Sequence, residues 1–282
     1  MKVIHVTHNY REMALDRVKP CVMALGFFDG IHLGHQRVIF EARKIATEKQ
    51  LPFAIMSFFP HPKEVLFNGE KVVPYLMPPS QKQKIFEKMG VDIFYHVHFD
   101  REFAALSPRQ FVYEYLLEFG AKVVVAGFDF TYGYRGEGNM NRIEADSDGK
   151  LKSIKVRKLA LAGQKISSTL IRELILAGEV EKIPDYLGAS YQLEGKVIFE
   201  KDRMEVKVDP YYLFPASGKY EVTVQHRNRL RQMIAFVDKG KLSLLYSNES
   251  SLILFENESI RIEWNQRLEN QLERIMKPVF TN

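Results

Sequence analysis

The sequence is poor in cysteine and has no long run of apolar residues. Its single cysteine, Cys21, cannot form a disulfide within the chain, and no Cys/His spacing of the zinc-binding type is present. No window reaches the roughly 18 apolar residues of a membrane span, and the opening stretch MKVIHVTHNY lacks the apolar core of a signal peptide. We therefore expect a cytoplasmic protein with no membrane partner, in which Cys21 is a small buried side chain.

A strong charge of one sign is also missing. The formal net charge is +5, and residues 187–282 contribute 14 Lys and Arg against 13 Asp and Glu, so most of the excess lies before residue 187. A nucleic-acid binder usually concentrates basic residues on one face. The charge therefore favours anionic small molecules as partners over nucleic acid, and it indicates no particular oligomeric state.

Between residues 20 and 161, apolar β-rich runs alternate with segments of helical character. The runs are almost continuously hydrophobic, which is typical of strands buried on both faces of a parallel sheet. Helix signals between them include a Ser107 cap before Pro108, a second pattern from Ser80 to Gly90, and an apolar stripe along residues 35–49. The alternation predicts an α/β domain with a Rossmann-like parallel sheet. The predicted strands are CVMALGF (21–27), FAIMSFF (53–59), IFYHVHF (93–99), KVVVAGF (122–128) and IKVRKLAL (154–161).

The pattern changes close to Pro184–Gly188. Downstream runs alternate polar and apolar residues with period two and are separated by polar turns. We expect a small antiparallel β-barrel-like domain closed by a C-terminal helix in NQRLENQLERIM, residues 265–276. The sequence thus predicts two domains, residues 1–186 and 187–282.

The stretch GFFDGIHLGH, residues 26–35, stands between the first predicted core strand and a helix. Anions bind at such strand-to-helix junctions because helix N-termini offer free amide groups. Gly26 and Gly30 allow a close approach of the backbone, and His32 and His35 can present imidazoles to phosphate oxygens and stabilise charge on a pentavalent phosphorus. Two alternatives are a capped turn with solvated histidines, and an HxxH metal pair with no obvious third ligand.

This stretch resembles the GxFDGxHxGH signature of the nucleotidyltransferase domain of prokaryotic FAD synthetases. Three further stretches support the resemblance in the same order along the chain. SFFPHP (57–62) resembles the family's aromatic-Pro-His-Pro loop, and VAGFDFTYGYRGEG (125–138) resembles its Gly-Asp-Phe motif with the following glycine-rich loop. ISSTLIREL (166–174) resembles its SSTxIR phosphate-binding signature, so the resemblance spans about residues 22–174.

The resemblance implies an FMN adenylyltransferase that transfers AMP from Mg-ATP to FMN and releases FAD and pyrophosphate. The implied catalytic residues are His32, His35 and Arg172. The implied ATP-binding residues are Gly26, Phe27, Asp29, Gly30, His32, Gly34, His35, Ser167, Ser168, Thr169 and Arg172. The implied flavin-binding residues are Phe59, His61, Pro62, Phe128, Asp129 and Tyr132. Mg²⁺ is expected as the cofactor, with ligands that the sequence does not identify.

Each of these motifs also has a plainer explanation. Ser167 can simply cap a helix that carries a surface arginine, and Asp129 can be a turn former at a strand end. Phenylalanines beside a sheet, such as Phe58 and Phe59, are commonly core residues. The order of the four stretches, rather than any one of them, favours the functional interpretation.

The second domain resembles a riboflavin kinase domain at two places, YLGASYQLEGKVI (186–198) and FPASGKYEVTV (214–224). The family's glycine-rich GxxxGRxxGxPTAN loop is expected between them. The chain instead has FEKDRMEVKVDPYYL (199–213), without glycine or threonine. A backbone without glycine cannot easily wrap a phosphate, so we expect an inactive kinase-like domain.

Acidic residues strengthen this expectation. Glu200, Asp202, Glu205 and Asp209 place negative charge where a phosphate would bind. No catalytic carboxylate is recognisable downstream; Glu256 and Glu258 are candidates only through their position near a strand end.

Three other functions remain open. The chain could be a bifunctional riboflavin kinase/FAD synthetase, or a non-catalytic flavin or nucleotide sensor that binds RNA or protein. Arginines in QHRNRLRQ (225–232) suit the sensor, although a solvated hairpin explains them more simply. The third is a nucleotidyltransferase acting on another phosphorylated acceptor.

Overall fold

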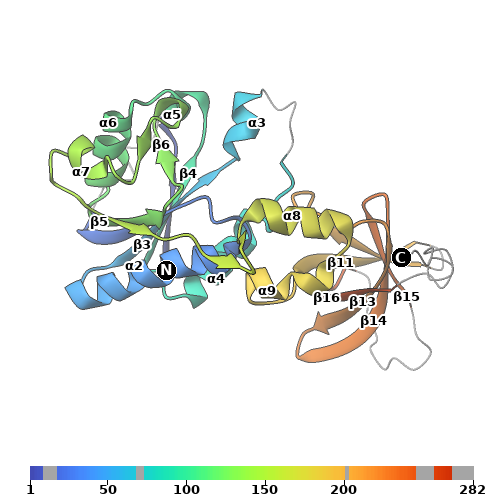
Figure 1. The fold of residues 1–282 in the computed structure, drawn as a ribbon. Helices are drawn as coiled ribbons and strands as arrows, with labels where there is room; N and C mark the ends of the chain where they lie inside the picture. Colours follow the sequence, from blue (N-terminus) through green and yellow to red (C-terminus); the bar gives the residue numbers. More distant parts are fainter. Residues whose placement is uncertain (9–17, 68–72, 201–202, 246–256, 269–282) are drawn as a thin grey trace. The chain divides into compact units, whose positions relative to one another are not determined.

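The chain folds into two compact units, shown as a ribbon in Figure 1. The first comprises residues 1–74 and 78–166, and the second comprises residues 75–77 and 167–282. This computed structural model describes residues 1–8, 18–67, 73–200, 203–245 and 257–268.

The first unit is built on a six-stranded sheet in which every neighbouring pair is parallel. The strand order is β1-β4-β3-β2-β5-β8. All five residues of β2 are buried, as the hydrophobic runs predict for a strand covered on both faces. The predicted Rossmann-like α/β fold is confirmed. The strands are β1 (Lys2–Val6), β2 (Cys21–Leu25), β3 (Phe53–Phe59), β4 (Ile93–His98), β5 (Ala121–Gly127) and β8 (Lys152–Val156).

The edge strand β1 was not among the predicted strands. It lies in MKVIHVTHNY, where the exposed His5 interrupts a short apolar run. Its register with β4, from Lys2 opposite Ile93 to Val6 opposite Val97, stabilises the strand through the backbone ladder. A partner that is distant in sequence therefore decides the conformation of this stretch.

Strand order reverses beside β2. The chain adds β3 and then β4 on one side of β2, whereas β5 pairs with its other side. In open parallel sheets, ligands bind beyond the carboxyl ends of the strands at such a reversal. Residues 26–35 follow β2 and residues 128–133 follow β5, so both motif segments flank this point.

Helices cover both faces of the sheet. In Figure 1, α2 (Leu33–Lys49) and α4 (Pro79–Lys88) lie on one side, and α5 (Arg101–Ala104) and α6 (Pro108–Phe111) lie on the other. The shorter elements of this unit are η2 (Asp29–Ile31), α3 (Pro62–Leu66), the π-helix η3 (Val112–Leu117), η4 (Tyr134–Gly136) and α7 (Ile143–Asp146), with the hairpins β6 (Thr131–Tyr132)/β7 (Gly138–Asn139) and β9 (Ala160–Leu161)/β10 (Gln164–Lys165).

The helix signals were correct in one case and misplaced in another. Ser107 forms a full capping box with Gln110 at the start of α6. Helix α4 begins at Pro79 rather than after a Ser80 cap, because a proline suits the first helical position and Ser80 then lies inside the first turn.

The second unit contains a closed barrel of six antiparallel strands, in the order β11-β12-β15-β14-β13-β16. Its apolar interior surrounds Trp264, the only tryptophan in the chain, which is fully buried. The predicted antiparallel barrel is confirmed. The strands are β11 (Gln192–Glu200), β12 (Arg203–Val208), β13 (Gly218–His226), β14 (Arg229–Asp238), β15 (Lys241–Leu245) and β16 (Ser259–Leu268).

The C-terminal helix prediction is wrong for its first four residues. Residues 265–268 continue β16, where Leu268 lies opposite Lys219 of β13. Closing the barrel requires β16 to pair with both β13 and β11, and this ladder overrides the helical pattern of the sequence. Residues 269–276 of the predicted helix lie outside the described part of the chain.

Helix α8 (Ser168–Ala177), η5 (Val180–Lys182) and α9 (Pro184–Leu187) belong to the barrel unit. Ile171 and Ile175 of α8 lie in one apolar core with the barrel interior. The compact units consequently divide at Ile166/Ser167, earlier than the predicted domain limit at 186/187. Residues 75–77 also join this unit, because Tyr75 exchanges backbone hydrogen bonds of 3.0 Å with Tyr211 and Leu213. The functional division at 186/187 stays a prediction.

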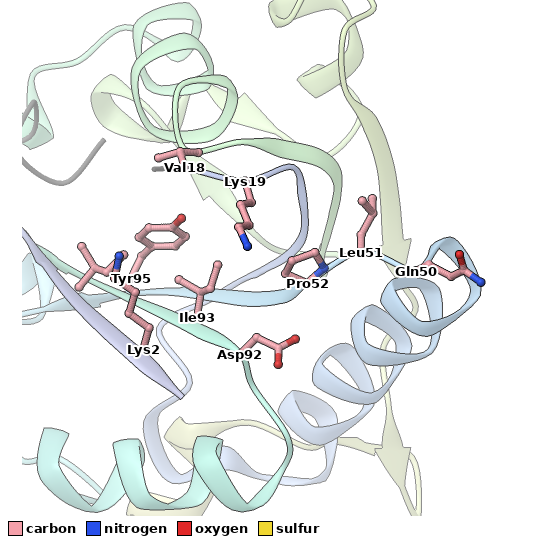
Figure 2. A pocket seen from close by; sticks show the side chains of 10 residues that line it. Lys2, Val18, Lys19, Gln50, Leu51, Pro52, Asp92, Ile93 and Tyr95 are labelled. Carbon is pink, nitrogen blue, oxygen red and sulfur yellow. The ribbon is translucent and has the colours of Figure 1, made fainter. Parts of the chain in front are cut away.

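A hollow of about 620 Å³ opens at the amino end of the parallel sheet. Figure 2 shows Lys19, Pro52 and Asp92 around it, each just before a strand. The motif segments follow the opposite, carboxyl ends of the strands, so this hollow is not the candidate active site. Among the described residues, no helix is long and apolar enough to cross a membrane.

The packing of α8 generates a first prediction. Replacing the fully buried Ile175 by alanine should lower the free energy of unfolding of the barrel unit by roughly 2–5 kcal/mol, because it removes apolar contacts and leaves a cavity. Urea unfolding followed by Trp264 fluorescence measures this unit. The neighbouring Leu176→Ala, at a side chain that is 56% exposed, should change the free energy by less than about 0.5 kcal/mol. An equal response of the two variants would contradict the assignment of α8 to the barrel core.

Candidate active site

The turn after β2 has an unusual backbone. Phe28, Gly30 and Ile31 all have positive φ, at 52°, 79° and 44°. Glycine adopts this region freely, whereas a residue with a Cβ loses roughly 1–2 kcal/mol there. Phe28 and Ile31 are nevertheless buried, so their surroundings hold them in place. Backbone strain of this kind is concentrated at functional sites.

This turn delivers His32 to the start of α2 as its N-cap. The Nδ1 atom of His32 accepts a hydrogen bond of 3.2 Å from the backbone N–H of His35. The two imidazole rings stack, with centroids 3.6 Å apart and planes at 16°. Because Nδ1 is an acceptor, a neutral His32 ring carries its proton on Nε2, which is then a hydrogen-bond donor.

Burial decides the charge of His32. The side chain is 6% exposed, and this loss of hydration lowers its pKa to about 4, although the Asp129 carboxylate and a backbone hydrogen bond oppose the change. His32 is therefore neutral at pH 7. It can donate a hydrogen bond to a phosphate oxygen, but a full positive charge at this edge has to come from other residues.

Glycine makes the stacked arrangement possible. A Cβ on Gly34 would lie 3.1 Å from two atoms of the His32 ring, and a Cβ on Gly26 would lie 2.8 Å from the Phe28 ring. The ring of Phe28 in turn meets His35 edge to face at 5.4 Å. These two glycines thus serve side-chain packing, while Gly30 serves the positive φ.

The SFFPHP segment meets the histidine turn. His61 caps α3 by accepting a 3.1 Å hydrogen bond from the Lys63 N–H at its Nδ1, and Pro62 is the first residue of the helix. The His61 ring packs edge to face on Phe27, with centroids 4.7 Å apart. Phe59 is half-buried at the end of β3, before a cis peptide bond to Pro60. Two motifs that are distant in sequence are therefore in contact.

The segment after β5 presents an exposed aromatic ring. Phe128 is 41% exposed, and the Lys165 ammonium lies 4.9 Å from its ring centroid. The same ammonium donates to the Asp129 carboxylate. Asp129 and Lys165 both influence the pKa of His32, so this segment belongs to the same electrostatic environment.

Tyr132 has a different place from the other predicted flavin residues. It is 5% exposed, lies in the core of the first unit, and packs parallel to Phe111. Its hydroxyl donates a 2.7 Å hydrogen bond to Asp146, and burial raises its pKa. The ring is thus enclosed in this structure, and its assignment to the flavin site stays a prediction.

The fourth motif starts α8 in the second unit. Ser167 is the N-cap and accepts a hydrogen bond from the Leu170 N–H at 3.3 Å. Ser168 and Thr169 occupy the first turn, where helix N–H groups lack intrahelical partners. Arg172 is partly exposed one turn further along. The motif therefore has the helix start that the sequence predicts, with polar side chains at a position suited to anions.

Two lysines near these motifs were not predicted as site residues. Lys165 contacts Asp129, as described above. Lys82 on α4 is 4% exposed, and its ammonium donates a 2.8 Å hydrogen bond to the Phe27 carbonyl. The available signal was its position four residues before the core residue Phe86, on the face of the helix that should be apolar.

The FAD synthetase family model matches residues 15–170, more than half of the chain. The chain belongs to the FAD synthetase family. The predictions of this family and of a nucleotidyltransferase enzyme are confirmed.

Curated relatives and a solved structure agree with this assignment. The chain is 36% identical to a bifunctional riboflavin kinase/FMN adenylyltransferase of Bacillus subtilis, over 96% of this chain and 91% of the relative. It is 44% identical to a protein of the same name from Listeria monocytogenes, over 79% of this chain and 73% of the relative. A crystal structure described as a macrolide-efflux protein from Streptococcus pneumoniae superposes with a TM-score of 0.82 at 27% identity, covering 95% of this chain and 100% of that one.

Within the stretch 199–213, the structure describes the end of β11, the strand β12 and the turn that follows it. Residues 203–208 are strand β12, paired with β11 on one side and β15 on the other. Asp209 starts the following turn, since its carboxylate accepts a 2.9 Å hydrogen bond from the Tyr211 N–H. The side chains of Glu200 and Asp202 lie outside the described part of the structure.

The other charged candidates of the barrel pair with one another. Glu258 accepts a 2.8 Å hydrogen bond from Arg227 and lies 3.2 Å from His226. Residues 225–232 form the predicted hairpin, with His226 opposite Arg229 across the turn. Glu256 lies outside the described residues.

No preformed metal centre occurs in the part of this FAD synthetase that the structure describes. No three His, Cys, Asp or Glu side chains are arranged there to hold a metal ion. Near the histidine turn, Asp29 is buried and Asp129 pairs with Lys165. Mg²⁺ commonly binds proteins through substrate phosphates and only one or two carboxylates, so these residues suit a metal that arrives with a nucleotide.

The lowered pKa of His32 predicts a pH dependence of stability. An unfolded His32 binds a proton near pH 6.5 and the folded one only near pH 4, so the unfolded state binds more protons between these values. Neutral His32 therefore contributes to the free energy of unfolding. This contribution is fully present above pH 6.5, and about 3 kcal/mol of it is lost as the pH falls toward 4. Chemical unfolding followed by circular dichroism should show a smaller loss for His32→Asn, which keeps a capping side chain. Identical slopes for wild type and His32→Asn would contradict the prediction.

Proposed function

We propose that this FAD synthetase transfers AMP from ATP to FMN, releases FAD and pyrophosphate, and does not phosphorylate riboflavin. The main support for the transfer of AMP to FMN is the stacked pair of His32 and His35. This pair lies at the start of α2, beside the reversal of strand order. The names of the curated relatives, which include FMN adenylyltransferase activity, support it.

The reaction needs alignment and charge stabilisation rather than a protein nucleophile. A phosphate oxygen of FMN attacks the α-phosphorus of ATP; a new P–O bond forms and the bond to the departing pyrophosphate breaks. The Nε2–H of neutral His32 and the backbone N–H groups of Leu33 and Gly34, the first two residues of α2, are donors for the oxygens that gain charge. Holding two anions in line supplies much of the remaining rate enhancement.

Positive charge and flavin contacts are assigned to the other motifs. Arg172, with Ser168 and Thr169, binds the phosphates of ATP through charge-assisted hydrogen bonds and the N-terminus of α8. The exposed ring of Phe128 stacks on the flavin, with Asp129 as a hydrogen-bonding neighbour. Phe59, His61 and Pro62 complete the proposed flavin side, and Tyr132, which is enclosed in the core, would have to become exposed to join them.

Mg²⁺ is proposed to enter with ATP. The described residues lack a cluster of three metal ligands, whereas the triphosphate supplies oxygens itself. When bound, the metal neutralises phosphate charge and orients the departing pyrophosphate.

The absence of kinase activity is supported by the barrel. Strand β12 lies in the segment where the kinase resemblance expects a glycine-rich phosphate loop; all six of its residues pair with β11, and Met204 and Glu205 also pair with β15. Amides committed to a ladder are not available to wrap a phosphate. The bifunctional alternative is favoured by the names of both relatives, which include riboflavin kinase.

Product analysis separates these functions. Purified protein should convert FMN and Mg-ATP to FAD, and should form neither FMN nor FAD from riboflavin and Mg-ATP. Chromatography of the flavins and a pyrophosphate-release assay provide the measurements. FMN arising from riboflavin would establish the bifunctional alternative, flavin binding without turnover would favour a sensor, and turnover only with another phosphorylated acceptor would replace FMN as the substrate.

Single substitutions test the proposed roles. His32→Ala and Arg172→Ala should each lower the turnover of FMN to FAD by roughly 10² or more, the scale expected when a transition-state donor is lost. Phe40→Ala and Glu173→Ala, at exposed positions of α2 and α8, should keep wild-type turnover. Wild-type rates for both His32→Ala and Arg172→Ala would remove the proposed mechanism.

A further inference from the structure

Lys82 is a buried cation with no role in the proposed chemistry. Among the described residues no other lysine is buried. Withdrawing an ammonium group from water is costly, and a buried ion pair or hydrogen-bonded charge is often no more stable than an apolar residue of the same volume. Methionine or leucine would satisfy the packing of α4 against the sheet. A charge at this position therefore points to a requirement other than core stability.

The ammonium group of Lys82 makes two contacts with Phe27. Its Nζ donates to the Phe27 carbonyl at 2.8 Å and lies 4.8 Å from the centroid of the Phe27 ring. Ser57 on β3 donates to the same carbonyl at 2.9 Å. The Phe27 carbonyl thus has a hydrogen bond from a strand and another from a helix, which fixes the peptide plane where the chain leaves β2.

Charged and titratable groups around Lys82 come from two further elements. Asp29 of η2 attracts the ammonium and opposes the effect of burial, which lowers the pKa of Lys82 to about 8. On β4, His96 has a pKa lowered to about 4, first by burial and then by the nearby Lys82. Asp29 is 1% exposed, so Lys82 also supplies positive charge beside a buried carboxylate.

The segment that Lys82 holds is the strained one. Phe28 follows Phe27 directly at φ 52°, and Gly30 and Ile31 continue at positive φ up to His32. Strained conformations persist where the surrounding structure over-determines them. A hydrogen bond to Phe27 and attraction to Asp29 act on both sides of Phe28, immediately before the residue that caps α2.

We propose that Lys82 is a positioning residue for the histidine pair: by holding the turn from Phe27 to Asp29, it fixes the position and hydrogen bonding of His32 and His35. The proposal rests on the adenylyl-transfer function assigned above, to which it adds a residue on α4. Lys82 acts through the turn and is not assigned a contact with substrate.

A double-mutant cycle tests whether Lys82 acts through His32. Lys82→Met should lower the kcat for FAD formation about 10-fold in the wild-type background, with a smaller change in KM. In a His32→Asn background the same substitution should change the rate less than about 3-fold, because the positioned ring is already gone. Lys88→Met, an exposed lysine of the same helix, should have no effect in either background. Equal losses from Lys82→Met in both backgrounds, or no loss in the first, would overturn the proposal.

A second measurement is independent of activity. Nitrogen-15 NMR of histidine rings in the full chain should show His32 as a neutral ring protonated on Nε2. Lys82→Met should change that signal because the turn no longer holds the ring in one position, whereas Lys88→Met should not. An unchanged His32 signal in Lys82→Met would overturn the positioning role even if no FAD forms, and a failure of wild type to form FAD would reject only the proposed function. If Lys82→Met does not fold, Lys82→Leu enters the same two tests with the same expected results, and Lys82→Gln, which keeps a donor for the Phe27 carbonyl, should stay closer to wild type in both.

Discussion

The backbone ladder of β2 is the constraint on which the first unit depends. This strand pairs with β3 on one side and β5 on the other, and all of its residues are buried. The chain must therefore leave the sheet at Leu25 without exposing or displacing the strand, and it must start α2 within a few residues. Positive φ at Phe28, Gly30 and Ile31 is the consequence, and it places His32 at the N-cap. Segments that follow β3 and β5 reach the same edge because their strands are parallel neighbours of β2.

Burial at this edge changes how the histidines can act. A solvated imidazole would be partly protonated near neutral pH, but His32 loses its hydration and stays neutral. Its capping bond then selects the ring nitrogen that carries the proton. In the proposed function, His32 therefore acts as a neutral donor, and positive charge is assigned to Arg172. Lys82 and Asp29 add a buried pair of opposite charges beside the histidine turn.

Closure of the barrel determines the backbone pairing of two segments of the second unit. Residues 203–208 pair with β11, and Met204 and Glu205 also pair with β15; Asp209 takes part in a turn and Glu258 in an ion pair with Arg227. The same requirement for closure draws residues 265–268 into β16. In β12 and in residues 265–268, the backbone hydrogen bonds of the barrel determine the conformation, and they override the local sequence pattern.

Sequence alone determined the alternation of strands and helices, the antiparallel character of the second unit, and the histidine, Gly-Asp-Phe and Ser-Ser-Thr segments. These features depend on periodicity and on short motifs, which are local properties of the chain. Tertiary structure decided the edge strand β1, the continuation of β16, the enclosure of Tyr132 and the membership of α8 in the barrel core. It also decided the neutral state of His32 and the hydrogen bond from Lys82 to the Phe27 carbonyl. Each of these results depends on burial or pairing with residues far along the chain, and a local pattern carries no information about such partners.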